Sequence, residues 1–484
     1  MESSMQPPSS RSQPFDTLIL DLGDVLFDWS VGPATPIPMK QLRRALATSV
    51  WFDFERGLIS KDECYRAVAQ QLGTSAEEVA TTFDTARRSI RMRPDVVSLI
   101  QELKPGRRIF AMSNISAPDW EWVRDHHSEC GVFDRVFTSA AAGERKPDLA
   151  FFRHVLQQTG VDPRRTVFVD DKLQNVFTAR SLGITGIIYD DFPDLERRLR
   201  SIFGDAVQRG EAFMRANALR HQSYTSAGQI ILENFTPLLI IEATGDPSLV
   251  EYTVTPGGPQ SFFADDTQYA YTPPPDIDTT SIAFTAAPNI VPDSVKHRVM
   301  DEMVANRSRD GILQVYFSPT RPRIDGVASI NAVHMFYTYG RGSEVKETLD
   351  WIIAILKTRA YVDGTYYYTT ADSFLYFLYR LLRVAPEVDK EIRLVFIERS
   401  RERVGKPGDA LALAMRVLFC TEYGIDATTD AIKLRDMQEA DGGWKDGWIY
   451  KYPSQGLSVA NRGLTTAFAV NALKAAFGGR IKPK

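Results

Sequence analysis

Two carboxylates separated by one residue follow three prolines in the second half of the chain, where residues 273–280 have the sequence Pro-Pro-Pro-Asp-Ile-Asp-Thr-Thr. The prolines lack amide donors and favour an extended entry. One interpretation is a helix N-terminus capped by Asp and Thr. The other is a coupled acid pair, Asp276 and Asp278, in which one carboxyl keeps its proton near neutral pH. Such an acid, shielded from water, is able to protonate a carbon–carbon double bond.

A second set of reactive residues lies in the first half. Asp21 comes directly after the apolar residues 17–20, Ser113 follows residues 109–112, and the pair Asp170-Asp171 follows residues 166–169. A carboxylate is able to attack phosphorus and form an acyl phosphate, which divides one difficult hydrolysis into two easier steps. Carboxylates also hold hard cations that neutralise phosphate oxygens. These residues therefore predict phosphoryl chemistry.

The elements that position this second set are short buried strands. Three apolar segments, each ending in polar residues and separated by helical patterns, predict a doubly wound parallel α/β sheet with its ligands at the carboxyl ends of the strands. Residues 29 to about 95 carry helical signals, for example at 40–47 and 75–89. We expect them to form a small helical cap over the site.

The second half is mostly helical. Apolar and aromatic residues recur at helical spacing in 345–357, 373–384 and 410–423, which predicts an all-α barrel of inner and outer helices. No alternating pattern predicts a second sheet. A long amphipathic helix over 194–218 leads out of the first domain. The multi-domain chain is therefore divided into a disordered N-terminal tail (1–14), a first domain (15–205, with its cap) and a second domain (206–484).

Composition narrows the class of protein. The net charge of -4 argues against a nucleic-acid partner, and three cysteines without a close pair argue against a disulfide framework or a cysteine-based zinc site. No apolar run is long enough to span a membrane, and the polar first residues lack the apolar core of a signal peptide. A cytoplasmic enzyme is expected, either a monomer or a homodimer.

The first half resembles the haloacid dehalogenase (HAD) superfamily of phosphatases over roughly residues 15–200. The resemblance implies Mg²⁺ as cofactor, with Asp21 as nucleophile and Lys146, in Arg-Lys-Pro-Asp, balancing charge. It implies phosphate binding by Ser113 with Asn114 beside it. The metal ligands it implies are Asp21, the backbone carbonyl of Gly23, Asp171 and Asn175.

Gly23 departs from the usual pattern of these phosphatases, which carry a second Asp there as general acid. Loss of a general acid typically lowers the rate about 10²–10⁴-fold. Some sugar-phosphate phosphatases of the superfamily are similar in having Gly at this position, and Asp24 follows it here. An active phosphatase and a silent, inherited domain therefore both stay open.

Residues 276–280 resemble the acid motif of proton-initiated (class II) terpene cyclases, in the Asp-x-Asp-Thr-Thr variant of sesquiterpene synthases that make drimane-type products. The resemblance implies that Asp278 donates the proton and Asp276 is its partner, while Thr279 and Thr280 orient the acid. Residues 438–444 also match a Gln-x-x-x-Gly-x-Trp repeat of triterpene cyclases, in which Gln438 and Trp444 brace the barrel.

Sixteen of the eighteen tyrosines follow residue 220. Aromatic faces stabilise cations by about 0.5–2 kcal/mol each, which gives these residues a role in a cyclase, although for any single one ordinary core packing is the better explanation. Arg321 and Arg323 are candidates to clamp a diphosphate; a solvated loop is the alternative. The candidate aromatic residues for contact with substrate are Phe336, Tyr337, Tyr339, Tyr366, Tyr367, Tyr368, Trp444 and Trp448.

Together the two resemblances imply a fusion of a phosphatase with a class II cyclase, similar to drimenyl and albicanyl diphosphate synthases. Farnesyl diphosphate would be cyclised to a bicyclic drimane-type diphosphate and then hydrolysed to drimenol or albicanol. Asp265-Asp266 has Tyr269, not an acid, three residues on, so the motif of ionising cyclases is absent. The alternatives are a cyclase with a silent phosphatase domain, a phosphatase with a helical binding module, and a non-catalytic helical solenoid.

Overall fold

The structure is a computed structural model that describes residues 15–31, 35–265, 273–452 and 456–477. The predicted N-terminal tail, as well as Asp266 and Tyr269, lie outside these ranges. The chain divides into two compact units, Met1–Phe203 and Gly204–Lys484, close to the boundary predicted at residue 205. Among the described residues, no helix has both the length and the apolar character needed to cross a membrane.

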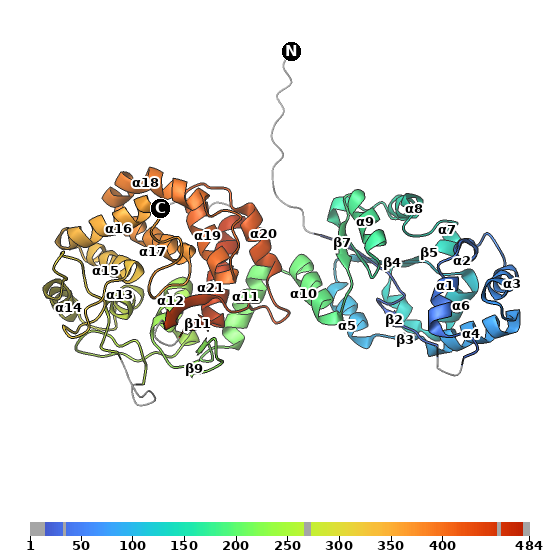
Figure 1. Cartoon of the computed structure of the whole chain (residues 1–484), viewed down its shortest axis with the longest axis horizontal. Helices are drawn as coiled ribbons and strands as arrows, with labels where there is room; N and C mark the ends of the chain where they lie inside the picture. Colours follow the sequence, from blue (N-terminus) through green and yellow to red (C-terminus); the bar gives the residue numbers. More distant parts are fainter. Residues whose placement is uncertain (1–14, 32–34, 266–272, 453–455, 478–484) are drawn as a thin grey trace, which may run out of the picture. The chain divides into compact units, whose positions relative to one another are not determined.

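The first unit is built on a five-stranded parallel sheet with the order β5-β4-β1-β6-β7 (Figure 1). Alternate residues of the central strand face opposite sides, so Leu18 and Leu20 join one hydrophobic core and Ile19 joins the other. This confirms the predicted doubly wound sheet. The strands are β1 (Thr17–Leu20), β4 (Arg108–Ser113), β5 (Arg135–Thr138), β6 (Thr166–Asp170) and β7 (Thr185–Ile188). The helices around them are α5 (Pro94–Leu103), α6 (Ala117–His126), α7 (Ser139–Ala142), α8 (Leu149–Thr159), α9 (Leu173–Ser181) and α10 (Phe192–Phe203).

A helical cap interrupts the chain after β1. It has its own hydrophobic core, in which the rings of Trp51 and Phe83 stack with centroids 4.5 Å apart. A short antiparallel pair, β2 (Phe27–Asp28) with β3 (Arg91–Met92), connects the cap to the sheet. The cap helices are α1 (Met39–Ala45), α2 (Ser49–Glu55), α3 (Lys61–Leu72) and α4 (Ala76–Ser89).

The second unit is a helical barrel. Within the described part of the chain, six inner helices pack in a closed ring, in the order α12-α13-α15-α17-α19-α21 and back to α12. Helices α16, α18 and α20 pack on the outside of this ring, and Figure 1 shows α18 at the rim of the unit. The inner helices are α12 (Phe235–Thr244), α13 (Ile277–Ala286), α15 (Gly326–Thr338), α17 (Ala371–Val384), α19 (Ala410–Glu422) and α21 (Arg462–Phe477). The others are α11 (Ala206–Ala216), α14 (Asp293–Ala305), α16 (Lys346–Thr358), α18 (Pro386–Arg401) and α20 (Thr428–Asp436).

Two features of the second unit differ from the sequence predictions. The predicted helix over 194–218 is broken at Gly204, and Asp205 caps α11 by accepting the backbone N–H groups of Val207 and Gln208.

The expectation of no second sheet is wrong, because a four-stranded sheet has the order β10-β11-β8-β9. Its strands are short and far apart in the sequence, so alternation does not reveal them. They are β8 (Ser223–Thr225), β9 (Ile230–Ile231), β10 (Trp448–Tyr452) and β11 (Leu457–Asn461). The 3₁₀ helices of the chain include η1 (Ser128–Val132), η2 (Pro163–Arg165), η3 (Pro247–Leu249) and η5 (Gly342–Val345).

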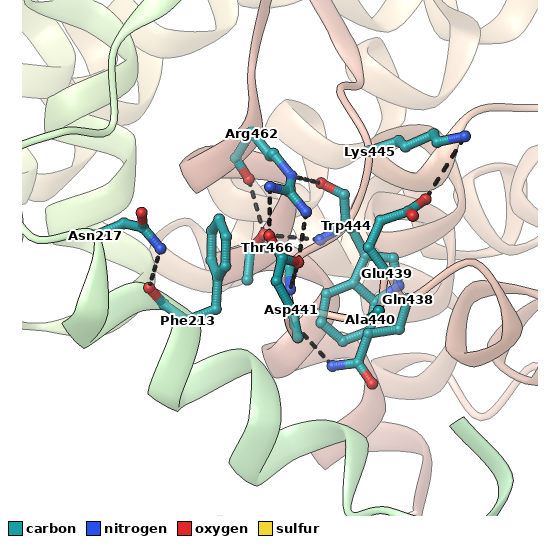
Figure 2. Close-up of polar contacts among 12 residues, drawn as sticks. Phe213, Asn217, Gln438, Glu439, Ala440, Asp441, Trp444, Lys445, Arg462 and Thr466 are labelled. Atoms are coloured by element: carbon teal, nitrogen blue, oxygen red, sulfur yellow. Dashed lines mark hydrogen bonds and ion pairs between the residues drawn. The ribbon is translucent and has the colours of Figure 1, made fainter. Parts of the chain in front are cut away.

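Residues 438–444 brace the barrel. The amide of Gln438 donates to the backbone carbonyls of Ala206 and Gly442, both at 2.8 Å. The fully buried Trp444 donates its indole N–H to the carbonyl of Leu434 at 2.6 Å. Figure 2 shows the ion pair of Arg462 with Asp441 beside this tryptophan. These bonds join α11, α20 and α21 near the chain's C-terminal end.

We expect Trp444→Ala to lower the free energy of unfolding of the second unit by about 3–5 kcal/mol, because it leaves a large cavity in the core. Differential scanning calorimetry of the full chain measures the change, with the transition of the first unit as an internal reference. The control is Leu394→Ala, whose side chain is 83% exposed and whose effect should stay within about 0.5 kcal/mol. Equal effects of the two substitutions would contradict the bracing role.

Candidate active sites

The segment that carries the acid pair is held against a neighbouring extended segment at the start of α13. Asp276 forms a bridge with Tyr316, and the N–H of Ile277 donates to the carbonyl of Val315 at 2.8 Å. The carboxylate of Asp276 caps the helix by accepting the backbone N–H of Thr279 at 2.7 Å. The helix-cap interpretation is therefore correct for Asp276, and the acid-pair interpretation stays a prediction.

Asp278 lies one residue into the helix and accepts two short hydrogen bonds. The amide Nδ2 of Asn331, on α15, donates to Oδ1 at 2.6 Å. The hydroxyl of Tyr368, just before α17, donates to Oδ2 at 2.6 Å. Both partners are neutral, so the carboxyl group is oriented without a neighbouring cation.

Burial favours the protonated form of both carboxyls. It raises the pKa of Asp278 to about 7, and the nearby Asp276 raises it further, whereas the bonds from Tyr368 and Asn331 oppose the shift. Burial raises the pKa of Asp276 to about 6, opposed by its bonds to the helix N-terminus. Of the two carboxyls, Asp278 therefore has the higher pKa, which agrees with its predicted role as the proton donor.

Both carboxyls line a cavity of about 440 Å³ in the second unit, a size within the roughly 300–1,000 Å³ typical of small-molecule sites. Its walls are mostly aromatic and aliphatic. Of the predicted aromatic candidates, Tyr366, Tyr367 and Tyr368 line it. The aromatic residues that line it without having been predicted are Phe235, Phe262, Phe263, Tyr316, Tyr450 and Tyr452.

Cationic side chains also line this cavity. Arg321 and Arg323, the predicted diphosphate clamp, both line it, as does Lys451 of β10. The guanidinium carbon of Arg321 lies 4.2 Å from the ring centroid of Tyr316. Arg323 is exposed and Asp276 is buried, whereas Arg321, Lys451 and Asp278 are half-buried. The unexpected sheet forms part of this wall.

Several predicted site residues in the second unit lie elsewhere. Trp444 is fully buried and is not among the residues that line the cavity, so its predicted contact with substrate is replaced by its bracing role. Phe336, Tyr337, Tyr339 and Trp448 do not line it either. The hydroxyl of Thr280 donates to the backbone carbonyl of Asp276 at 2.6 Å and so positions the segment instead of contacting the acid. Thr279 lines the cavity.

The first unit gathers its predicted residues at the carboxyl ends of β1, β4 and β6. The fully buried ammonium of Lys146 lies 2.8 Å from Oδ1 of Asp21 and 2.7 Å from Oδ2 of Asp170. Burial raises the pKa of Asp21, and the charge of Lys146 opposes that shift. Asp170 also accepts the amide of Asn175 and the backbone N–H of Lys172. Both carboxylate oxygens of Asp170 therefore have hydrogen-bond partners within the protein.

Three carboxylates meet at this point. Oxygens of Asp21, Asp170 and Asp171 lie within 4.8 Å of one another, with Lys146 and Lys172 as neighbouring ammonium groups. The Oδ1 atom of Asn175 is buried and has no hydrogen-bond partner among the described residues. Clustered carboxylates and a buried amide oxygen are the hard donors that Mg²⁺ prefers. The residues present therefore fit the predicted cation.

The remaining predicted residues of the first unit have distinct positions. Ser113 is buried at the end of β4. The side-chain amide of Asn114 donates to the backbone carbonyl of Lys146 at 2.9 Å and accepts the backbone N–H of Lys146 at 2.8 Å. The side chain of Asn114 therefore positions the lysine. A Cβ atom built at Gly23 meets nothing within 4 Å; steric crowding therefore does not explain the absence of a side chain. Asp24 adopts a left-handed conformation with φ of 58°.

Besides these aromatic residues, Asn331 and Lys451 were not predicted, and the contacts of Tyr368 and Asp170 were not predicted. Asn331 and Lys451 lie in ordinary helical and strand patterns that carry no local signal. Tyr368 was predicted as an aromatic surface but serves as a hydrogen-bond donor. Asp170 was recognised only as the neighbour of Asp171, although two adjacent acids after a buried strand place one side chain inward and one outward.

Comparison with known families assigns both halves of the chain. Residues 207–339 match the family described as the sesquiterpene cyclase astC-like C-terminal domain. Residues 48–183 match the haloacid dehalogenase-like hydrolases. The acid pair lies within the first of these matches, and Lys146 with the carboxylate pair at the end of β6 lies within the second.

Relatives are found for the whole chain and for its first half. A drimenol cyclase from Aspergillus calidoustus is 42% identical over 462 residues, which cover 94% of this chain and 87% of that protein. A sesquiterpene phosphatase from Aspergillus oryzae is 39% identical over 191 residues, which cover 39% of this chain and 97% of that protein.

Among solved structures, a HAD family enzyme from Bacteroides thetaiotaomicron is 20% identical and covers 37% of this chain and 95% of its own, with a TM-score of 0.31. The extent of the match to the Aspergillus calidoustus protein decides the family. The chain is an enzyme of the drimenol cyclase family, in which a haloacid dehalogenase-like hydrolase domain precedes a sesquiterpene cyclase domain.

Proposed function

We propose that this enzyme carries out two reactions in sequence. The second unit cyclises farnesyl diphosphate to a bicyclic drimane-type diphosphate, drimenyl or albicanyl. The first unit then hydrolyses the diphosphate to drimenol or albicanol. The observation that carries the proposal is a carboxyl group, Asp278, that lines an aromatic cavity with its pKa raised to about 7. The names of the two Aspergillus relatives support both halves of the proposal.

The cyclisation is an isomerisation that begins and ends with a proton. Asp278 donates its proton to the terminal double bond of the substrate and leaves a tertiary carbocation. The remaining double bonds attack in turn and close two rings, and a proton then leaves a carbon next to the final cation. The aromatic walls stabilise each cation by about 0.5–2 kcal/mol per ring face in contact and exclude the water that would otherwise trap it.

The diphosphate stays bonded throughout this step. Arg321, Arg323 and Lys451 carry positive charge on the wall of the same cavity as the two carboxyls, and Arg323 is exposed to solvent. Arginine is suited to this because its planar group presents paired donors to phosphate oxygens. Held there, the charged end of the substrate directs its hydrocarbon chain inward toward Asp278.

In the first unit, Asp21 is the nucleophile. Its carboxylate attacks the terminal phosphorus to form an acyl phosphate while the bond to the bridging oxygen breaks, and water then hydrolyses the acyl phosphate to inorganic phosphate. A second turn on the remaining monophosphate releases the alcohol, whose oxygen takes up a proton from water. Lys146 compensates negative charge, and Ser113 binds a phosphate oxygen. Mg²⁺, held by Asp21, Asp171, Asn175 and the carbonyl of Gly23, would neutralise charge on the transferred group.

A second candidate function is cyclisation alone, with the bicyclic diphosphate as product. Gly23 favours it, because a phosphatase of this superfamily usually has its general acid there. The geometry of Asp21, Lys146 and Asp171 favours the active phosphatase, because their charges are arranged as the hydrolysis requires. The closed helical ring around an acid pair disfavours both a simple binding module and an open solenoid.

The proton-donor assignment predicts that Asp278→Asn abolishes cyclisation, because an amide has no acidic proton to give. We expect the bicyclic product from farnesyl diphosphate to fall at least about 10³-fold, since general acid catalysis alone contributes about 10²–10⁴-fold. Gas chromatography with mass spectrometry after phosphatase treatment of the extract measures it. The control Asp310→Asn removes an exposed carboxylate and should leave the product unchanged. A bicyclic product from the Asp278 variant would refute the assignment.

The raised pKa of Asp278 predicts a pH dependence. The enzyme is active with this carboxyl protonated, so kcat/KM for cyclisation should be level at lower pH and fall about tenfold per pH unit above pH 7. Initial rates of bicyclic product formation between pH 5.5 and 9 measure this dependence. The range extends about 1.5 to 2 pH units on each side of pH 7, and each unit changes the ratio of protonated to ionised carboxyl about tenfold. A rate that rises through this range would require the ionised form instead.

The phosphatase assignment predicts that Asp21→Asn changes the product and not the cyclisation. An amide at this position cannot form an acyl phosphate, so the free alcohol should disappear and the bicyclic diphosphate should accumulate at the original rate. Liquid chromatography with mass spectrometry, without added phosphatase, separates the two products. Free alcohol formed by the variant at the original rate would show that the first unit is silent and that another process releases it.

A further inference from the structure

A chain of polar side chains continues from Asp278 into the wall of the barrel. Asn331 donates its amide N–H to Oδ1 of Asp278 at 2.6 Å. Behind it, the guanidinium of Arg380, on α17, donates to Oδ1 of Asn331 at 2.7 Å. The other face of the same guanidinium forms a two-pronged ion pair with Glu242, on α12, at 2.8 and 2.7 Å. Three inner helices of the ring therefore support the acid on α13.

This arrangement fixes the direction of the amide. A guanidinium only donates hydrogen bonds, so Asn331 must turn its oxygen toward Arg380 and its nitrogen toward Asp278. Oδ1 of Asp278 therefore always faces an N–H donor, and a proton on that oxygen would have no acceptor there. Oδ2 is different, because its partner is the hydroxyl of Tyr368, which is able to rotate and accept a proton carried on Oδ2, and Tyr368 itself lines the cavity.

We propose that Asn331, oriented by the Arg380–Glu242 ion pair, is a positioning residue that assigns the transferred proton to Oδ2 of Asp278. The inference rests on the proposed function, in which Asp278 is the proton donor. It adds that a hydrogen-bond chain outside the cavity decides which oxygen is the acid and how strongly it holds its proton.

The ion pair also keeps the charge near the acid balanced. A lone cation behind Asn331 would favour the ionised carboxylate, and the carboxylate of Glu242 offsets that effect. His334, on α15, does not add a charge, because burial and the neighbouring arginines hold its pKa well below the usual range. The other charged or titratable groups that face this region are Asp276, Asp325, Tyr316, Arg321, Arg323, Tyr366, Tyr367, Tyr368, Tyr376, Arg383, Tyr450, Lys451 and Tyr452.

Two substitutions should shift the pH profile of cyclisation in opposite directions. Asn331→Leu removes a donor that stabilises the carboxylate, so the midpoint of kcat against pH should move up while kcat falls roughly 10²-fold, as for loss of one positioned donor. Glu242→Gln leaves the charge of Arg380 without its counter-charge, so the midpoint should move down. Arg380→Lys keeps a charged donor and should retain more kcat than Arg380→Leu. Product formation from farnesyl diphosphate at saturating concentration gives kcat at each pH.

A matched control separates positioning from simple destabilisation. Asn471 also donates a side-chain amide within the barrel, to the carbonyl of Ala243 at 2.7 Å. Asn471→Leu should leave the midpoint where it is in the unsubstituted enzyme. Thermal unfolding reports whether each variant is folded, and hydrolysis of p-nitrophenyl phosphate by the first unit provides an independent check of intact protein.

The outcomes distinguish failure of the positioning role of Asn331 from failure of the proton-donor function of Asp278. A lower kcat for Asn331→Leu with an unmoved midpoint would overturn the positioning role. If that variant does not fold, Glu242→Gln decides, because its side chain keeps the same shape, and an unmoved midpoint there overturns the role as well. Cyclisation by Asp278→Asn would instead refute the proton-donor function on which the inference rests.

Discussion

For the function proposed, the second unit must satisfy one electrostatic constraint: the carboxyl group of Asp278 has to stay protonated near neutral pH and still be acidic enough to protonate a double bond. Burial alone would make Asp278 a weak acid that keeps its proton too tightly. The bonds from Asn331 and Tyr368 act in the other direction by stabilising the carboxylate that remains. Asp276 also affects the balance between the protonated and ionised forms of the pair. Because the helix N-terminus stabilises the negative charge of Asp276, the proposed assignment of the proton to Asp278 is favoured.

The closed helical ring supplies the rigidity that this balance requires. The acid, the amide, the guanidinium and its counter-charge come from four inner helices, α13, α15, α17 and α12. A change of a few tenths of an ångström in the packing of any of them would alter bonds of 2.6–2.8 Å. The bracing bonds around Gln438 and Trp444 lie outside the cavity, yet they hold α11, α20 and α21 in the arrangement that closes the ring.

Local motifs in the sequence predicted the acid pair, the nucleophile, the lysine and the carboxylates after β6, because each depends on residues close together in the chain. The doubly wound sheet and the helical barrel followed from periodicity. The partners of Asp278 could not be predicted in this way, since Asn331 and Tyr368 are 53 and 90 residues away and only the ring closure brings them near. The four-stranded sheet was missed for the same reason, because its two halves lie at opposite ends of the unit's sequence.

The aspartates proposed as nucleophile and as proton donor differ in their surroundings. Asp21 and Asp276 are buried and Asp278 is half-buried, but only Asp21 is in direct contact with the ammonium of Lys146, and a cluster of carboxylates beside it suits a cation. Positive charge at that distance favours the ionised form, which a nucleophile requires. The hydrogen-bond partners of Asp278 are neutral, and the nearest guanidinium behind them is paired with Glu242. Burial raises the pKa of each carboxyl to about 7, so the difference between them lies in their contacts. An ammonium in direct contact suits the nucleophile proposed for Asp21, whereas neutral donors with the cation one residue removed suit the acid proposed for Asp278.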